Sequence, residues 1–158
     1  MRVDFTLNGR RVSINTPASL RLADLLHNNL KVESLHPSCY RGECGNCAIL
    51  MNGELTYSCM LPVFAAQGSS ILTFEGILES VEYEDIQRGL SEEQSFPCNY
   101  CRPSKLVIIE SILMNNPEPK IQEVLEVFSG TYCPCTNLHN LARGVIRAAF
   151  YRRRRRHA

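Results

Sequence analysis

Hydrophobic patterns predict two β-hairpins in the first half of the chain. Hydrophobic and polar residues alternate over residues 3–14, and a second pair of short strand-like segments covers residues 48–57. Each pattern is interrupted in its middle by the same dipeptide, Asn8-Gly9 in the first and Asn52-Gly53 in the second. Asn-Gly favours the tight two-residue turns that join antiparallel strands. We therefore predict a hairpin at each place.

A change of period between the hairpins predicts a helix. Leucines recur at spacings of three and four from Leu22 to Leu30, after possible helix-start residues at 16–19. Residues 71–74 form a short hydrophobic run that reads as a closing strand. Two hairpins, one helix and a last strand describe a small α+β unit with the β-grasp arrangement.

The pattern becomes helical in the second half, from about residue 82 to residue 151. Three amphipathic stretches are visible: 104–114, a second that ends at Gly130, and a third that Asn137 can cap. We interpret their hydrophobic stripes as core. The inward positions are Leu106, Ile109, Leu113, Ile121, Val124, Leu125, Phe128, Leu138, Leu141, Ala142, Val145, Ile146 and Ala149.

These patterns divide the chain into three parts. We predict a sheet-rich domain at 1–76, a helical domain at 77–151 and a disordered basic tail at 152–158. The 158 residues are 44% hydrophobic and 21% charged, which is typical of a globular protein. The net charge of +1 is misleading, because the arginine run at 152–156 leaves the rest mildly acidic. Such charge blocks are usually solvated tails.

Several classes of function are disfavoured by composition. Aromatic residues are not interleaved with the arginine run, so we expect no nucleic-acid binding. No apolar stretch approaches the length of a membrane span, and the N-terminus lacks an apolar signal region. We therefore expect a cytoplasmic protein. No glycine-rich phosphate loop or hydrolytic triad is present, and we expect no substrate site in this chain.

The strongest chemical signal is a cysteine loop with the spacing Cys-x4-Cys-x2-Cys, followed by a distant fourth cysteine. The residues are Cys39, Cys44, Cys47 and Cys59. This is the plant-type arrangement for a [2Fe–2S] cluster. The cluster is an anion that needs backbone N–H donors close by, and Gly42 and Gly45 allow the main chain to approach it.

The other four cysteines form a second candidate metal set. Cys98 and Cys101 precede one predicted helix, whereas Cys133 and Cys135 lie between two others. Two close cysteine pairs fit either a tetrahedral zinc site or an iron–sulfur cluster. The plant-type loop in the same chain favours the cluster. The even number of cysteines also allows disulfide bonds, but cysteine pairs at short spacings are more typical of metal ligands.

Residues 2–151 as a whole resemble the small iron–sulfur subunit of the xanthine dehydrogenase family of molybdenum hydroxylases. The resemblance rests on the order and spacing of all eight cysteines and on the switch from strands to helices. It implies a plant-type ferredoxin-like domain followed by an all-α helical-bundle [2Fe–2S] domain.

The resemblance also implies a function. The chain would be the electron-transfer subunit of an oxidoreductase, holding two [2Fe–2S] clusters. Electrons would come from a molybdenum–pterin site on a large partner subunit and move toward FAD on another subunit, or another acceptor. The alternatives from other classes are a free-standing two-cluster carrier and a helical domain that binds zinc.

The sequence departs from this family's pattern around the second set. Relatives usually have Gln directly before the first cysteine of the helical domain, where its side chain touches the pterin. Here that position is Pro97, which offers no donor. Pro134 replaces the usual Arg between the last two cysteines. We predict that the clusters are retained and that the contact to the molybdenum cofactor or the partner interface is altered.

Overall fold

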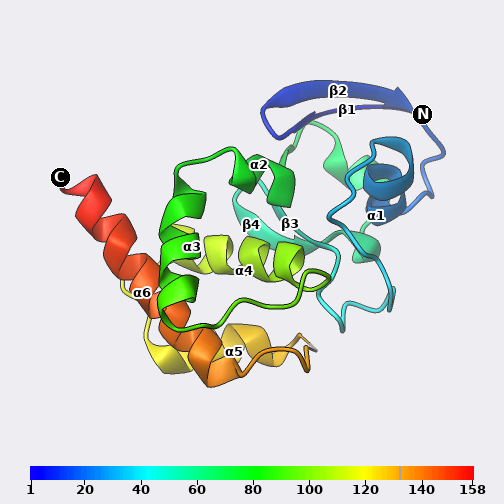
Figure 1. Ribbon diagram of the computed structural model, residues 1–158. Coiled ribbons are helices and arrows are strands. Elements are labelled where there is room, and N and C mark those ends of the chain that lie inside the picture. Colours follow the sequence, from blue (N-terminus) through cyan, green and yellow to red (C-terminus); the bar gives the residue numbers. More distant parts are fainter. Residues whose placement is uncertain (132) are drawn as a thin grey trace.

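A five-stranded mixed sheet forms the first half of the fold. The computed structural model describes residues 1–131 and 133–158. The strands are β1 (Arg2–Leu7), β2 (Arg10–Asn15), β3 (Ala48–Met51), β4 (Glu54–Tyr57) and β5 (Ser70–Leu72). Their order is β2-β1-β5-β3-β4, with β1 and β5 parallel and the other neighbours antiparallel (Figure 1).

Both predicted hairpins are confirmed, and their turns explain them. Asn8 and Gly9 have φ angles of 49° and 80°, and Asn52 and Gly53 have φ angles of 53° and 83°. These left-handed conformations match the twist of the flanking strands, and they are accessible mainly to Asn and Gly.

The predicted helix after the first hairpin is present but irregular. It consists of α1 (Leu22–Asp24) and a π-helical turn, η1 (Leu25–Asn29). The predicted start residues at 16–19 do not cap it, because the residue that precedes α1 is Arg21. Two 3-10 turns, η2 (Ser58–Met60) and η3 (Val63–Ala66), complete the first half.

The closing strand is shorter than predicted. β5 ends at Leu72, and a short helix, α2 (Phe74–Leu78), begins where we expected the strand to continue. Asn8 fixes this change of direction. Its side chain accepts a 2.8 Å hydrogen bond from the Thr73 N–H and donates a 2.9 Å hydrogen bond to Thr73 Oγ1.

The second half is helical, as predicted. The long helices are α3 (Glu82–Glu92), α4 (Arg102–Asn115), α5 (Ile121–Ser129) and α6 (Leu138–Arg156). The Asn137 side chain caps α6 by accepting hydrogen bonds from the N–H groups of His139 and Asn140. No helix in the described ranges is both long and apolar enough to cross a membrane.

One hydrophobic core joins the two halves. α4 lies between the sheet and the other long helices (Figure 1). Its apolar side chains pack in one cluster with Ala48 and Leu50 of β3 and with Leu141 and Val145 of α6. A second cluster packs α1 and η1 against the other part of the sheet. The shared core fixes the cysteine loops of the two halves relative to each other.

The predicted disordered tail is instead ordered through Arg156. The last turns of α6 contain the arginine run, and Arg152 is only 3% exposed. Arg152 contacts the carboxylates of Glu82, Asp85 and Glu110, and Arg155 also pairs with the first two of these. Acidic residues from distant helices hold the run in place.

Helices α3 and α6 approach so closely that their backbones touch at a glycine. A Cβ atom on Gly89 would lie 2.4 Å from the Ala148 nitrogen and 2.5 Å from the Gly144 carbonyl oxygen. Gly89→Ala is therefore expected to lower the free energy of unfolding by about 2–3 kcal/mol, as overpacking does. Denaturant unfolding monitored by circular dichroism measures the change.

The matched control is Gly130→Ala, since a Cβ atom there meets nothing within 4 Å and the φ angle is −83°. Its effect should stay within about 0.5 kcal/mol. Equal stability of the two variants would contradict the backbone contact at Gly89.

Candidate metal centres

The first cysteine loop aims backbone N–H groups at cysteine sulfur. Cys39 Sγ accepts hydrogen bonds from the N–H groups of Arg41, Glu43 and Cys44 at 3.3–3.4 Å, and Cys44 Sγ accepts one from Asn46 at 3.5 Å. Three residues of the loop, Tyr40, Gly42 and Gly45, have φ angles of 54–75°. Such turns form nests that bind anions.

These donors change the acidity of Cys39. Partial burial raises its pKa, but the three N–H donors outweigh that effect and lower the pKa to about 6. These donors therefore favour the thiolate, which is the form that ligates metal.

Cys59 meets the loop from the end of the second hairpin. The Ser58 N–H and hydroxyl both donate to the Cys47 carbonyl, at 3.1 Å and 2.8 Å. This brings Cys47 and Cys59 into one buried cluster, and burial raises the pKa of Cys47 to about 12. Within this set, the Cys44 N–H bonds Cys39 Sγ, and Cys47 lies in a cluster with Cys59.

The second cysteine set lies around the start of α4. The Cys101 N–H donates to Cys98 Sγ at 3.4 Å. The Cys98 thiol neighbours those of Cys101 and Cys135, and the Cys133 thiol neighbours the same two. Burial raises the pKa of Cys101 to about 12. All four predicted residues of this set are therefore brought together.

Both sets suit a [2Fe–2S] cluster in the chemistry of their donors. Each iron of such a cluster takes two cysteine thiolates, and each set presents four cysteines with N–H donors to sulfur. All eight cysteines are free of disulfides. Among residues 1–131 and 133–158, no three or more Cys, His, Asp or Glu side chains are arranged to hold a single metal ion.

Direct contacts join the two sets. The Ser104 hydroxyl donates to Asn46 Oδ1 at 3.3 Å, and the rings of His36 and Tyr100 stack with centroids 4.4 Å apart. A Cβ atom on Gly45 would lie 2.8 Å from Thr131 Cγ2. Gly45 is therefore needed both for its φ of 75° and for this close approach. The surroundings of Gly42 are less crowded, because a Cβ atom added to Gly42 would lie 3.4 Å from Met60 Cγ.

Lys105 and Glu110 are buried charged residues that sequence reasoning did not single out. Glu110 interrupts the apolar stretch of α4, and that interruption was the available signal. Glu110 belongs to the ion-pair network of Arg152, and Lys105 lies beside the cysteines.

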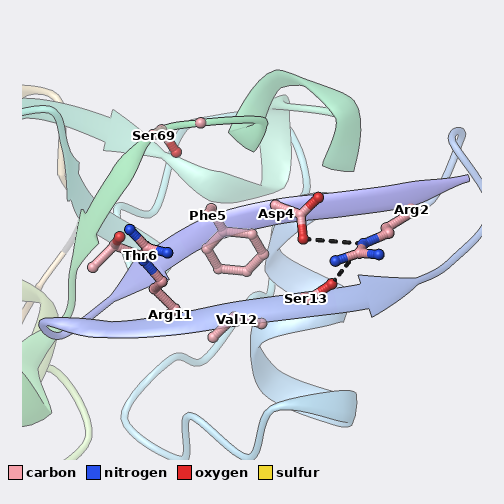
Figure 2. A pocket seen from close by; sticks show the side chains of 9 residues that line it. Arg2, Asp4, Phe5, Thr6, Arg11, Val12, Ser13 and Ser69 are labelled. Atoms are coloured by element: carbon pink, nitrogen blue, oxygen red, sulfur yellow. Dashed lines mark hydrogen bonds and ion pairs between the residues drawn. The ribbon is translucent and has the colours of Figure 1, made fainter.

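The described residues line several cavities. One of about 410 Å³ lies along the β1–β2 hairpin, where Arg2 Nε is 3.2 Å from Asp4 Oδ1 and 2.9 Å from Ser13 Oγ (Figure 2). Phe5, Val12 and nearby polar residues complete its lining, which contains none of the cysteines.

Comparison with known proteins identifies the class first. Residues 73–146 match the family described as "[2Fe-2S] binding domain". This range contains the second cysteine set. This part of the chain is therefore similar to [2Fe–2S] binding domains.

Relatives of nearly full length then identify the family. The chain is 32% identical over 142 residues to a probable xanthine dehydrogenase subunit of Bacillus subtilis (strain 168), covering 90% of this chain and 82% of that protein. It is 33% identical over 134 residues to "Nicotinate dehydrogenase small FeS subunit" of Eubacterium barkeri, covering 85% of each.

A solved structure agrees with these relatives. Quinoline 2-oxidoreductase from Pseudomonas putida 86 superimposes with a TM-score of 0.87 and 31% identity, covering 98% of this chain and 96% of that chain. The chain belongs to the small iron–sulfur subunits of the xanthine dehydrogenase family of molybdenum hydroxylases. The resemblance inferred from the cysteine pattern is confirmed.

Proposed function

We propose that this chain carries electrons through two [2Fe–2S] clusters held in series. One cluster would be bound by Cys39, Cys44, Cys47 and Cys59 in a β-grasp domain at 1–76. The other would be bound by Cys98, Cys101, Cys133 and Cys135 in a helical-bundle domain at 77–151. The observation that carries this proposal is the presence of two four-cysteine sets whose loops are joined by direct side-chain contacts.

The protein's own residues supply what such a pathway requires. When bound, a [2Fe–2S] cluster accepts and donates single electrons. N–H donors to Cys39 and Cys98 stabilise negative charge on sulfur. The buried pair Cys47 and Cys59 keeps water from one side of the first set. The Asn46–Ser104 contact keeps the two sets close together.

We propose a molybdenum–pterin subunit as electron donor and an FAD subunit, or another acceptor, as the next carrier. The relatives support this, since they are named as subunits of xanthine and nicotinate dehydrogenases. We also propose a cytoplasmic location, because cysteines free of disulfides are typical of reducing compartments.

A first experiment measures the clusters. Anaerobically purified protein should contain about four irons and four acid-labile sulfides per chain. Electron paramagnetic resonance (EPR) of the reduced protein should show two distinct [2Fe–2S] signals. About two irons and one zinc per chain would assign zinc to one set. Colourless, iron-free protein would refute the proposal.

Pro97 favours a second candidate, a free-standing carrier that no longer docks on a molybdenum subunit. This residue has no side-chain donor, and its carbonyl is occupied by Arg102 at 3.2 Å and 3.3 Å. Purification of the chain from its native host separates the two candidates. A stable complex with a molybdenum-containing subunit supports the first, whereas an isolated monomer that retains both clusters supports the second.

A further inference from the structure

Lys105 is a buried cation in the first turns of α4, four residues after Cys101. Its side chain is only 1% exposed. The ammonium donates a hydrogen bond to Thr131 Oγ1 and lies 5.3 Å from the centroid of the Phe128 ring. The Thr131 hydroxyl in turn donates to the Phe128 carbonyl at 3.0 Å, so its lone pairs face Lys105. The ammonium is thus held in one position.

No carboxylate in the described part of the chain forms an ion pair with this ammonium. That distinguishes Lys105 from Arg152, the other buried cation, which three carboxylates surround. An ammonium buried without a counter-charge is costly, and one hydroxyl and one aromatic ring offset only part of that cost.

The missing counter-charge lies in the cysteine sets. Burial lowers the pKa of Lys105, and negative charge on the sulfurs of Cys133, Cys101 and Cys44 opposes that effect. These sulfurs belong to both sets, with two in the second and one in the first. Ligated clusters would concentrate negative charge on the same sulfurs.

Lys105 also lies at the junction of the two cysteine loops. Its neighbour Ser104 binds Asn46 of the first loop, and its partner Thr131 packs against Gly45 of the same loop. A charge fixed at this junction acts on both cysteine sets.

We propose that Lys105 is a positioning residue that raises the reduction potentials of both clusters, and more strongly that of the cluster on Cys98, Cys101, Cys133 and Cys135. This inference rests on the proposed function. Reduction adds one electron, and hence one negative charge, to an anionic cluster. A fixed cation in a low-dielectric interior stabilises the reduced state more than the oxidised state.

The test is an EPR-monitored redox titration of the purified, cluster-loaded chain. Lys105→Met keeps a side chain of similar length and removes the charge. We expect its second-set cluster to become at least tenfold harder to reduce, which is about 59 mV for a one-electron couple. The first-set cluster should shift in the same direction by less. Lys105→Arg keeps the charge and should restore potentials close to those of the wild type.

The matched control is Lys120→Met, which removes the same charge from an exposed side chain. Solvent and salt screen such a charge, so both potentials should remain unchanged. Thr131→Val supplies a second probe, since it keeps the lysine but removes the hydroxyl that positions it. The second-set potential should fall in this variant too, even if Lys105→Met fails to assemble clusters.

The possible failures are distinguishable. Two wild-type signals with unchanged potentials in both Lys105→Met and Thr131→Val would refute the role of Lys105 and leave the proposed function intact. A wild-type protein without two [2Fe–2S] signals would refute both.

Discussion

Replacing Arg152 with methionine is expected to lower the free energy of unfolding by about 3–5 kcal/mol, because it leaves a buried carboxylate without its partner. Arg152 Nη2 lies 2.6 Å from Glu110 Oε2, and the two side chains are 3% and 6% exposed. Methionine fills much of the arginine's volume, so the loss measures charge pairing more than packing. The measurement is the denaturant midpoint of the cluster-loaded chain under anaerobic conditions.

This penalty should depend on pH. Burial raises the pKa of Glu110, and Arg152 partly offsets that rise. Without the arginine, the folded-state pKa of Glu110 rises further above its unfolded value. A carboxyl whose pKa is raised in the folded protein destabilises the fold most at pH values above that raised pKa. The destabilisation disappears below the pKa of the unfolded protein, because the carboxyl is then protonated in both the folded and the unfolded state. The difference in free energy of unfolding between Arg152→Met and the wild type should therefore become smaller as the pH falls from neutral into the acid range.

Arg154→Met is the matched control, because Arg154 is exposed on the same turn of α6. Its effect should stay within about 0.5 kcal/mol. If Arg152→Met and Arg154→Met unfolded at the same denaturant concentration, the buried network would not stabilise the fold.

The same arginines show where sequence reasoning reaches its limit. A run of five positive charges is locally indistinguishable from a solvated tail. Its order depends on Glu82, Asp85 and Glu110, which lie more than 40 residues earlier in the chain. Pairing over that separation is a tertiary property that no local pattern reveals. Lys105 was missed for the same reason, since its environment comes from α5 and two loops.

Features that depend on local chemistry could be predicted. The hairpins follow from Asn-Gly turns, and the start of α6 follows from the Asn137 cap. The cysteine sets were recognisable because metal ligation constrains residue type and spacing together. The parallel pairing of β1 with β5 was not predictable, since it joins strands about 60 residues apart. Asn8 is an intermediate case. Its turn was predicted, but the hydrogen bond that its side chain accepts from the Thr73 N–H was not.

Single alanine substitutions in the two cysteine sets should each remove one cluster and leave the other. Alanine offers no ligand atom, and each iron needs both of its thiolates. Cys59→Ala should therefore lose the first-set EPR signal, and Cys101→Ala should lose the second-set signal. Iron content should fall by about half in each variant, from about four atoms per chain to about two. These variants also assign the signals used in the Lys105 titration.

Each of the two variants serves as the control for the other, because the first set is built on the second hairpin and the second set on the start of α4. The shared core contains apolar side chains from both halves, and neither Cys59 nor Cys101 belongs to it, so removing one thiol should leave the other set in place. Loss of zinc with full retention of iron in Cys101→Ala would assign zinc to the second set. Loss of both signals in either variant would contradict independent assembly of the two centres.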